Sequence, residues 1–299
     1  MHPIPIICGP TASGKTSLAL EMAAQYPIEI VSADSRQMVR YLDIGTAKPT
    51  PDERARVPFH LIDLIEPGER YSAFRFISDA SQAIEQILKR EHVPVIVGGT
   101  GLYLRALTDG VVEIEPGDMA IREQLERELA EVGPQVMYEK LRQIDPLEAA
   151  KSHPNNRVRV IRALEIFYLT GKTKSEMTAT GGYRRSDFQF EYYCLAPPRP
   201  ELYEAINRRV DKMMASGLVA ELRSLVERGQ LEQIRRANII GYNELIQWLD
   251  GRVSLDEAVA AIKQNTRRYA KRQMTWFRGQ TGCKFYETAV ELRHKLRLV

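Results

Sequence analysis

The sequence predicts an α/β protein, with a parallel sheet flanked by helices and an all-helical inserted domain. Short apolar strands alternate with amphipathic helices in the first part of the chain, small or polar residues follow each strand, and residues 118–183 show only helical patterns. Such alternation is typical of a parallel sheet with helices on both faces. We expect residues 1–114 and 186–299 to form the two parts of the core and residues 115–185 the insertion.

The first part of the core contains three predicted strands. Residues 4–8, 28–31 and 93–97 are short apolar runs, as in buried parallel strands. Residues 15–25 and 74–90 have apolar side chains at helical spacing, and a helix is also expected after Gly101. Ligands of such sheets bind beyond the carboxyl ends of the strands, so the residues that follow these strands are candidate site residues.

The rest of the chain is predicted to be mainly helical. Helical patterns cover residues 118–131, 134–144 and 156–170, with Gly133-Pro134 between the first two. The alternating, aromatic-rich stretch 188–195 predicts a return to the sheet. Two long helices are expected at 200–228 and 255–278, and the second opens with a capping-box pattern at Ser254.

Charge is distributed unevenly along the 299 residues, whose net charge is +3. Residues 1–150 hold 15 Lys and Arg against 23 Asp and Glu, a net of −8, which leaves +11 for residues 151–299. A basic half favours a polyanionic partner, although solvated helix faces would give the same count. No apolar run reaches the roughly 18 residues of a membrane span and no signal-peptide pattern is present, so we expect a cytoplasmic protein without membrane contact.

Cysteines are few. Cys8, Cys194 and Cys283 are far apart in the sequence and make no metal-ligand spacing. Their odd number argues against a disulfide framework and favours a reducing compartment. Each is expected to be a small apolar filler.

Residues 9–16 match the phosphate-binding pattern G-x-x-x-x-G-K-[ST] in full, between a predicted strand and a predicted helix. The motif consists of Gly9, Pro10, Thr11, Ala12, Ser13, Gly14, Lys15 and Thr16. Its backbone N–H groups surround phosphate oxygens, its lysine neutralises the terminal phosphates, and its threonine hydroxyl can bind Mg²⁺. The core is therefore expected to be P-loop NTPase-like. The motif holds di- or triphosphates, ATP included, and does not identify the reaction.

Asp34 follows the second predicted strand, beside the phosphate loop of a parallel sheet. A carboxylate at this position could accept a proton from a nucleophile. It could also bind Mg²⁺ through water, or cap a turn. Topology leaves these three roles open.

The predicted C-terminal helix is strongly basic. Residues 261–278 contain six Lys and Arg and no acid, with aromatic residues between them. Lys263, Arg267 and Lys271 recur at four-residue spacing and so share a face. Single-stranded RNA binds cations and stacks on aromatic rings, so RNA contact is one interpretation. The other is a solvated surface over core aromatics.

Several segments together resemble the bacterial tRNA dimethylallyltransferases, also called tRNA isopentenyltransferases. The segments are residues 9–16, 32–37, 43–49, 97–103, 153–155, 162–165, 241–242 and 271–276. They occur in the family's order over most of the chain. The phosphate loop is shared with many families, whereas residues 43–49 (Asp-Ile-Gly-Thr-Ala-Lys-Pro) are far more specific.

The resemblance implies transfer of a dimethylallyl group from its diphosphate to N6 of the tRNA adenosine just 3′ of the anticodon. Asp34 would be the general base, and Lys15, Thr100 and Arg209 would complete the catalytic set. Mg²⁺ would be the cofactor, bound by Thr16. The residues implied to contact the tRNA are Asp34, Ser35, Arg36, Gln37, Thr100, Arg122, Val158, Arg159, Val160, Ile161, Arg162, Gly241, Tyr242, Arg268, Lys271 and Arg272.

Three other functions are weighed against this one. A P-loop kinase of a nucleotide or small metabolite would use the phosphate loop but leaves the basic helix without a role. A non-catalytic RNA-binding module would leave Asp34 and Thr100 idle. A prenyltransferase acting on free adenylate would need no RNA-binding surface. The expected partners are the tRNA anticodon stem-loop and dimethylallyl diphosphate; no protein partner is implied, and we expect a monomer.

Overall fold

The computed structural model describes residues 3–111, 119–180 and 188–296. The chain divides into two compact units, Met1–Thr108 with Ser186–Val299, and Asp109–Arg185. The predicted domain boundaries, 114/115 and 185/186, fall outside the described residues, and each unit is considered by itself. Among the described residues no helix has the length and apolar character needed to cross a membrane.

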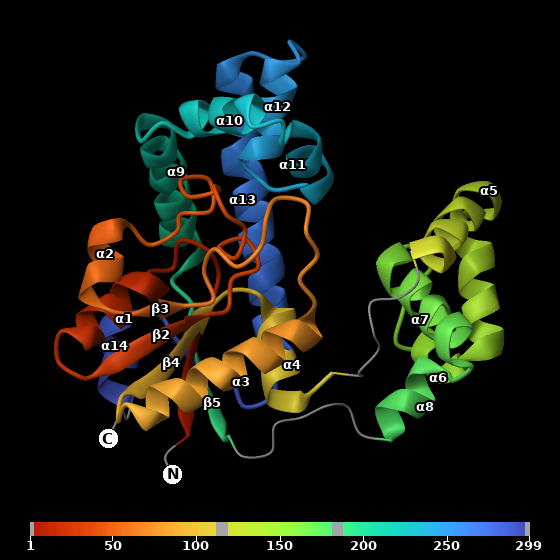
Figure 1. Ribbon diagram of the computed structural model, residues 1–299, viewed down its shortest axis with the longest axis horizontal. Helices are drawn as coiled ribbons and strands as arrows, with labels where there is room; N and C mark the ends of the chain where they lie inside the picture. The colour runs from red at the N-terminus through yellow and green to blue at the C-terminus, as the bar shows by residue number, and fades with distance from the viewer. Residues whose placement is uncertain (1–2, 112–118, 181–187, 297–299) are drawn as a thin grey trace. The chain divides into compact units, whose positions relative to one another are not determined.

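The first unit is built on a six-stranded, wholly parallel sheet in the order β3-β2-β4-β1-β5-β6 (Figure 1). The strands are β1 (Ile4–Cys8), β2 (Ile28–Ser32), β3 (Phe59–His60), β4 (Val93–Gly98), β5 (Phe190–Leu195) and β6 (Lys284–Tyr286). The fold class and the four strands expected from the sequence are confirmed. The edge strands β3 and β6 were not predicted, because two or three residues are too few to show alternation.

Helices cover both faces of this sheet. The helices of the first unit, as far as the structure describes it, are α1 (Lys15–Ala23), α2 (Pro51–Arg56), α3 (Ala73–Lys89), α4 (Gly101–Asp109), α9 (Arg199–Ala215), α10 (Leu218–Glu227), α11 (Leu231–Ala237), α12 (Tyr242–Leu249), α13 (Leu255–Arg278) and α14 (Ala289–Lys295). Ile6 of β1 belongs to the cluster that includes α3, α4 and α13, whereas Ile7 belongs to the cluster with α1 and α14. Successive residues of a strand therefore serve opposite faces, as the pleat requires.

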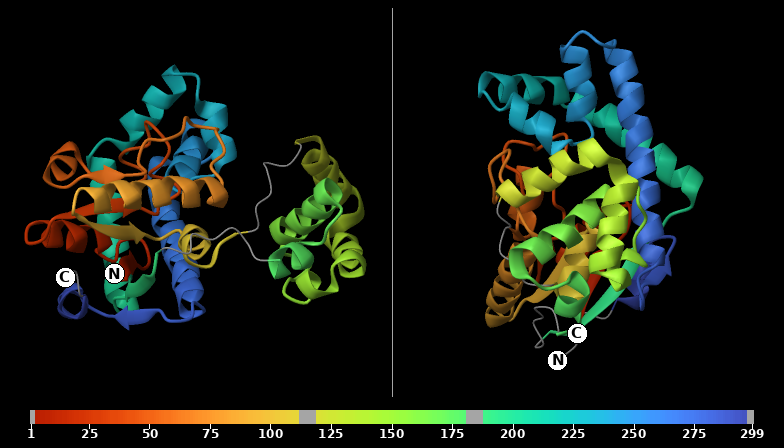
Figure 2. Two further views of the ribbon diagram at one scale, coloured as in Figure 1. Left: turned by 60° about the horizontal axis from the view of Figure 1, so that its bottom comes forward. Right: turned by 90° about the vertical axis from the view of Figure 1, so that its right-hand side faces the viewer.

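The prediction of one long helix at 200–228 is wrong. The structure divides it into α9 and α10, because Gly217 adopts a left-handed conformation with φ of 98°. Such a residue ends a helix, and glycine takes this conformation without steric cost. The predicted helix 255–278 is confirmed as α13, with the capping box at Ser254. Figure 2 shows α13 running the length of the first unit.

The second unit is helical. It contains α5 (Met119–Ile144), α6 (Pro146–Ala149), α7 (Arg157–Thr170) and α8 (Lys174–Ala179). The break expected at Gly133-Pro134 is present inside α5, where Gly133 has φ of 81°. Leu125, Met137, Leu141 and Leu164 are among the buried residues that form its core. The unit thus has an apolar core of its own.

Candidate functional site

A cavity of about 800 Å³ lies beyond the carboxyl ends of β1, β2 and β4. This size suits a small organic substrate. The predicted site residues that line it are Thr11, Ala12, Lys15, Thr16, Asp34, Ser35, Arg36, Gln37, Arg209, Gly241 and Arg272. The structure thus brings together residues from both ends of the chain, as the topology of a parallel sheet requires.

The phosphate loop turns tightly between β1 and α1. A Cβ atom on Gly9, whose φ is 138°, would lie 2.3 Å from the carbonyl oxygen of Leu195 in β5, so only glycine fits. Gly14 is in the left-handed region (φ 94°) and directly precedes the first helical residue, Lys15. The first N–H groups of α1 consequently face the loop, where an anion would be stabilised.

The ammonium group of Lys15 lies against the phosphate loop. Its Nζ donates to the carbonyl oxygen of Pro10 at 2.5 Å and to the hydroxyl of Ser13 at 3.4 Å. Burial, and secondarily the positive charge of Arg209, lower the pKa of Lys15 to about 8. An anionic ligand would reverse both effects by favouring the charged ammonium group.

Arg209 comes from α9 and lies in the same cavity. Burial lowers the pKa of its guanidinium group, and the carboxylate of Asp34 acts in the opposite direction. An arginine stays charged even with a lowered pKa. Two cations, Lys15 and Arg209, therefore share one partly desolvated pocket, where the carboxylate of Asp34 partly offsets their charge. Such a pocket favours a polyanion.

Asp34 follows the end of β2 and lies on a turn that hydrogen bonds hold in place. Its Oδ1 accepts a hydrogen bond from the backbone N–H of Arg36 at 2.9 Å. The hydroxyl of Thr100 accepts one from the backbone N–H of Ser35 at 3.0 Å, and the N–H of Thr100 donates to Ala33 at 3.1 Å. Thr100 therefore orients the Asp34 turn. It is not among the residues that line the cavity.

Gln273 is a site residue to which the sequence analysis assigned no role. It is 7% exposed; its Oε1 accepts from the backbone N–H of Thr11 at 2.8 Å, and its Nε2 donates to the carbonyl of Gly99 at 3.0 Å. A Cβ atom on Gly99 would lie 2.3 Å from this Nε2. One side chain of α13 thus connects the phosphate loop to the end of β4. The signal in the sequence was its place in segment 271–276, one of those that carry the family resemblance.

The family-specific segment 43–49 is held by one carboxylate. Glu221 of α10 accepts the backbone N–H groups of residues 43, 44 and 45 at 2.9, 2.7 and 3.0 Å. It also accepts the hydroxyl of Tyr242 at 2.5 Å. A Cβ atom on Gly45 would meet the ring of Tyr242 at 2.5 Å, which explains the glycine. Because Tyr242 is fully buried here, the expectation that its side chain contacts RNA is corrected.

Two of the three cations that share a face of helix α13 contact side chains of another helix. Nζ of Lys263 lies 2.5 Å from Oδ1 of Asp211, and Arg267 donates to Oδ1 of Asn207 at 2.7 Å. Both partners belong to α9, so these two cations hold helices together. Of the row whose contact with RNA or with solvent the sequence left open, Lys263 and Arg267 thus bind another helix, and Lys271 is exposed.

Four other cations of α13 are exposed: Arg268, Lys271, Arg272 and Arg278. Arg272 lines the cavity and lies over the ring of Tyr269, with 5.6 Å from its guanidinium carbon to the ring centre. Arg36, from the Asp34 turn, is also exposed at the cavity. Arg36 and Arg272 thus give the cavity a basic rim.

In the helical unit, the predicted RNA-binding arginines are partly engaged in ion pairs. Arg122 and Arg162 lie 3.6 and 2.9 Å from the buried carboxylate of Glu165. Arg159 lies 2.7 Å from the buried Glu148. A buried carboxylate is destabilising without such a partner, so these arginines also stabilise the unit.

The stretch 158–162 is only partly available to a partner. Val158 is 72% exposed. Val160 and Ile161 are 1% and 2% exposed and pack in the core of the unit. The expectation that their side chains contact RNA is therefore corrected: on a helix, neighbouring residues face different directions, and these two face inward.

Family models match most of the chain. The model described as IPP transferase matches residues 37–280, and the model described as isopentenyl transferase matches residues 2–58. A tRNA dimethylallyltransferase of Pelobacter propionicus is 48% identical over 272 residues, which cover 91% of this chain and 88% of that protein. One of Thermotoga maritima is 43% identical over 298 residues, with 98% and 96% covered.

Solved structures give the same result. A tRNA isopentenylpyrophosphate transferase of Bacillus halodurans superimposes with a TM-score of 0.70 at 39% identity, covering 99% of this chain and 94% of that one. A eukaryotic dimethylallyltransferase acting on tRNA gives a TM-score of 0.78 at 31% identity, with 93% and 70% covered.

Proposed function

Because the chain belongs to the IPP transferase family of tRNA dimethylallyltransferases, we propose how its residues carry out the transfer of a dimethylallyl group to tRNA. The acceptor is N6 of the adenosine that follows the anticodon on its 3′ side, and diphosphate is released. One observation carries the residue-level proposal: Lys15, Arg209 and Asp34 line a single cavity at the phosphate loop. Cations for a leaving diphosphate and a base for the attacking amine are thus available together.

The leaving group is bound by the phosphate loop. As N6 attacks the allylic carbon, the carbon–oxygen bond breaks and its electron pair departs with the diphosphate. Negative charge therefore grows on the diphosphate in the transition state. Lys15, Arg209 and the first N–H groups of α1 stabilise that charge, and stabilisation is stronger where water is excluded.

Asp34 accepts the proton that the amine loses. An exocyclic adenine amine is a weak nucleophile, so proton removal and positioning both contribute. The hydrogen bond between Thr100 and the backbone of Ser35 orients the turn that carries Asp34. Thr100 is accordingly proposed as a positioning residue rather than as a group that touches the substrate.

Mg²⁺ fits the residues present. The hydroxyl of Thr16 and the carboxylate of Asp34 line the cavity beside Lys15, and both are oxygen donors of the kind that Mg²⁺ prefers. We propose that Thr16 holds the ion. When bound, it would neutralise diphosphate charge.

The tRNA is proposed to contact the basic rim of the cavity, formed by Arg36 and Arg272, and the exposed cations Arg268 and Lys271 of α13. The adenine is inaccessible within a stack, so the nucleotide must be flipped out to reach Asp34. In the helical unit, Val158 and the unengaged donors of Arg122, Arg159 and Arg162 stay candidates for RNA contact. The kinase alternative leaves this rim without a role.

The proposal is tested with dimethylallyl diphosphate labelled in the prenyl group and unmodified tRNA. Label should appear in the RNA with the parent protein. Asp34→Asn should lower single-turnover transfer about a hundredfold or more, with tRNA binding retained, because a general base contributes roughly that much. Asp52→Asn, which removes an exposed carboxylate in α2, is the matched control. Unchanged transfer by Asp34→Asn would remove the base assignment.

A further inference from the structure

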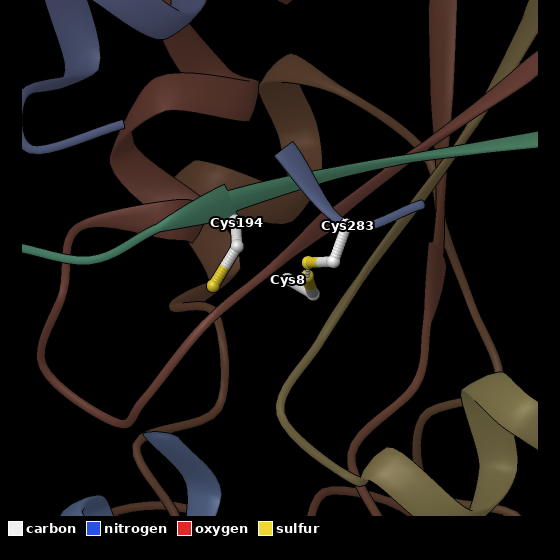
Figure 3. Close-up of side chains that lie close together, drawn as sticks. All are labelled: Cys8, Cys194 and Cys283. Carbon is white, nitrogen blue, oxygen red and sulfur yellow. Dashed lines mark hydrogen bonds between the residues drawn. The ribbon is translucent and has the colours of Figure 1, made fainter. Parts of the chain in front are cut away.

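The three cysteines, expected from the sequence to be separate fillers, form one cluster. Their sulfur atoms all lie within 4.8 Å of one another, and the sulfurs of Cys8 and Cys283 are 4.0 Å apart. Cys8 and Cys194 are in-register partners on the neighbouring strands β1 and β5, and Cys283 precedes β6 (Figure 3). They are the only cysteines of the chain. The sheet topology thus collects every thiol of the protein at one point.

The spacing of the sulfurs suits a metal ion. With a metal–sulfur distance of about 2.3 Å, tetrahedral or trigonal geometry places sulfur atoms about 3.8–4.0 Å apart. The distance between the sulfurs of Cys8 and Cys283 already has this value. The two sulfur–sulfur distances that involve Cys194 need to shorten by less than about 1 Å. Three sulfur donors select a thiophilic ion such as Zn²⁺ or Cu(I) over Mg²⁺. Cys283, which is partly exposed, provides access from solvent.

A metal ion that binds the three sulfur atoms would displace the protons of the thiols. The ion and the three sulfurs carry a net charge near −1 for a divalent metal, and the cation Lys15 is close enough to interact with Cys8 and Cys194.

The position of the cluster gives it a functional consequence. Cys8 directly precedes Gly9 of the phosphate loop, and Cys194 directly precedes Leu195, whose carbonyl packs against Gly9. Drawing the sulfurs together would displace the two backbone segments whose close approach shapes the loop. A negatively charged cluster would also attract Lys15 away from a diphosphate.

We propose that Cys8, Cys194 and Cys283 form a binding site for a thiophilic metal ion, and that its occupation weakens diphosphate binding at the adjacent phosphate loop. This site is distinct from the Mg²⁺ position proposed at Thr16. It supplies no group to the transfer reaction. It makes the enzyme sensitive to zinc or copper.

Binding of Zn²⁺ to the full chain, measured by competition with a chromophoric chelator, tests the site. One ion per chain is expected, and Cys283→Ser and Cys194→Ser should each weaken binding at least about tenfold, since each removes a ligand. Co²⁺ should produce a thiolate charge-transfer band in the parent that both variants lack. His92→Gln is the matched control. His60 and His92 both contact Glu29, and these three side chains are a second site at which Zn²⁺ could bind.

The functional consequence is measured on protein loaded with one equivalent of Zn²⁺ and freed of excess metal. Pyrophosphate affinity should fall severalfold in the parent and stay unchanged in Cys283→Ser treated in the same way. Zinc affinity that is equal in parent and cysteine variants, or loss of binding only in His92→Gln, would overturn the metal site. Equal pyrophosphate affinity of loaded and metal-free parent would overturn the connection to the phosphate loop. Neither result bears on the transferase activity, which is measured without zinc.

Discussion

Lys15 contributes a pH dependence to the binding of pyrophosphate. Burial and the neighbouring Arg209 lower the pKa of its ammonium group from 10.5 to about 8. A bound diphosphate favours the charged form and so raises this pKa again. Below about pH 8 the cation is already present, whereas above about pH 8 binding must take up a proton. The affinity for pyrophosphate therefore falls as the pH rises through 8.

The expected size follows from the pKa. With a value of about 8, roughly nine tenths of Lys15 is protonated at about pH 7 and roughly one tenth at about pH 9. If the complex restores the ordinary pKa, the affinity falls about tenfold over this interval, or about 1.4 kcal/mol. At about pH 8, binding takes up roughly half a proton per pyrophosphate at this residue.

Isothermal titration calorimetry in two buffers of different ionisation enthalpy measures that proton uptake directly. Pyrophosphate itself titrates, so the comparison is with Lys15→Arg, which keeps a positive charge at every pH used. The variant should bind pyrophosphate more weakly than the parent, and its affinity should depend less on pH. At about pH 8 it should take up about half a proton less on binding. The reasoning is refuted if parent and variant have parallel pH profiles and equal proton uptake.

Two further predictions concern side chains that position the site. Gln273→Met should lower pyrophosphate affinity about tenfold in equilibrium binding, because a buried N–H of the phosphate loop and the carbonyl of Gly99 lose their partner; Gln264→Met, at an exposed position of the same helix, should change little, and equal losses would contradict this account. Glu221→Gln should lower the free energy of unfolding in denaturant by about 1–3 kcal/mol, because three backbone N–H groups lose a charged acceptor. The exposed Glu227→Gln on the same helix should change little, and equal stability of the two variants would argue against the role of Glu221.

Features that depend on neighbouring residues were predicted from the sequence. Each of the strands β1, β2 and β4 is formed by one short, unbroken apolar run. The phosphate loop and the capping box of α13 each lie within a few consecutive residues as well. Their geometry follows from local backbone preferences and hydrophobic periodicity, which a single sequence displays. The position of Asp34 at the cavity follows from the same reasoning, since parallel strands end at one edge of the sheet.

Features that depend on distant residues required the tertiary structure. Gln273 reaches Thr11 across 262 positions, and Cys8 meets Cys283 across 275. No periodicity encodes such contacts, because they arise only when the strands take their order in the sheet. Burial is decided in the same way: helical pattern alone did not distinguish the inward-facing Val160 from the exposed Val158.

The sequence by itself thus determined the fold class, the phosphate loop and the resemblance to tRNA-modifying prenyltransferases. The tertiary structure decided which side chains support that loop, which cations of α13 bind α9, and that the three thiols lie together. The physical reason is the distance along the chain over which each interaction acts. Backbone geometry and hydrophobic patterning act between neighbours in the chain, whereas packing, desolvation and charge act between neighbours in space.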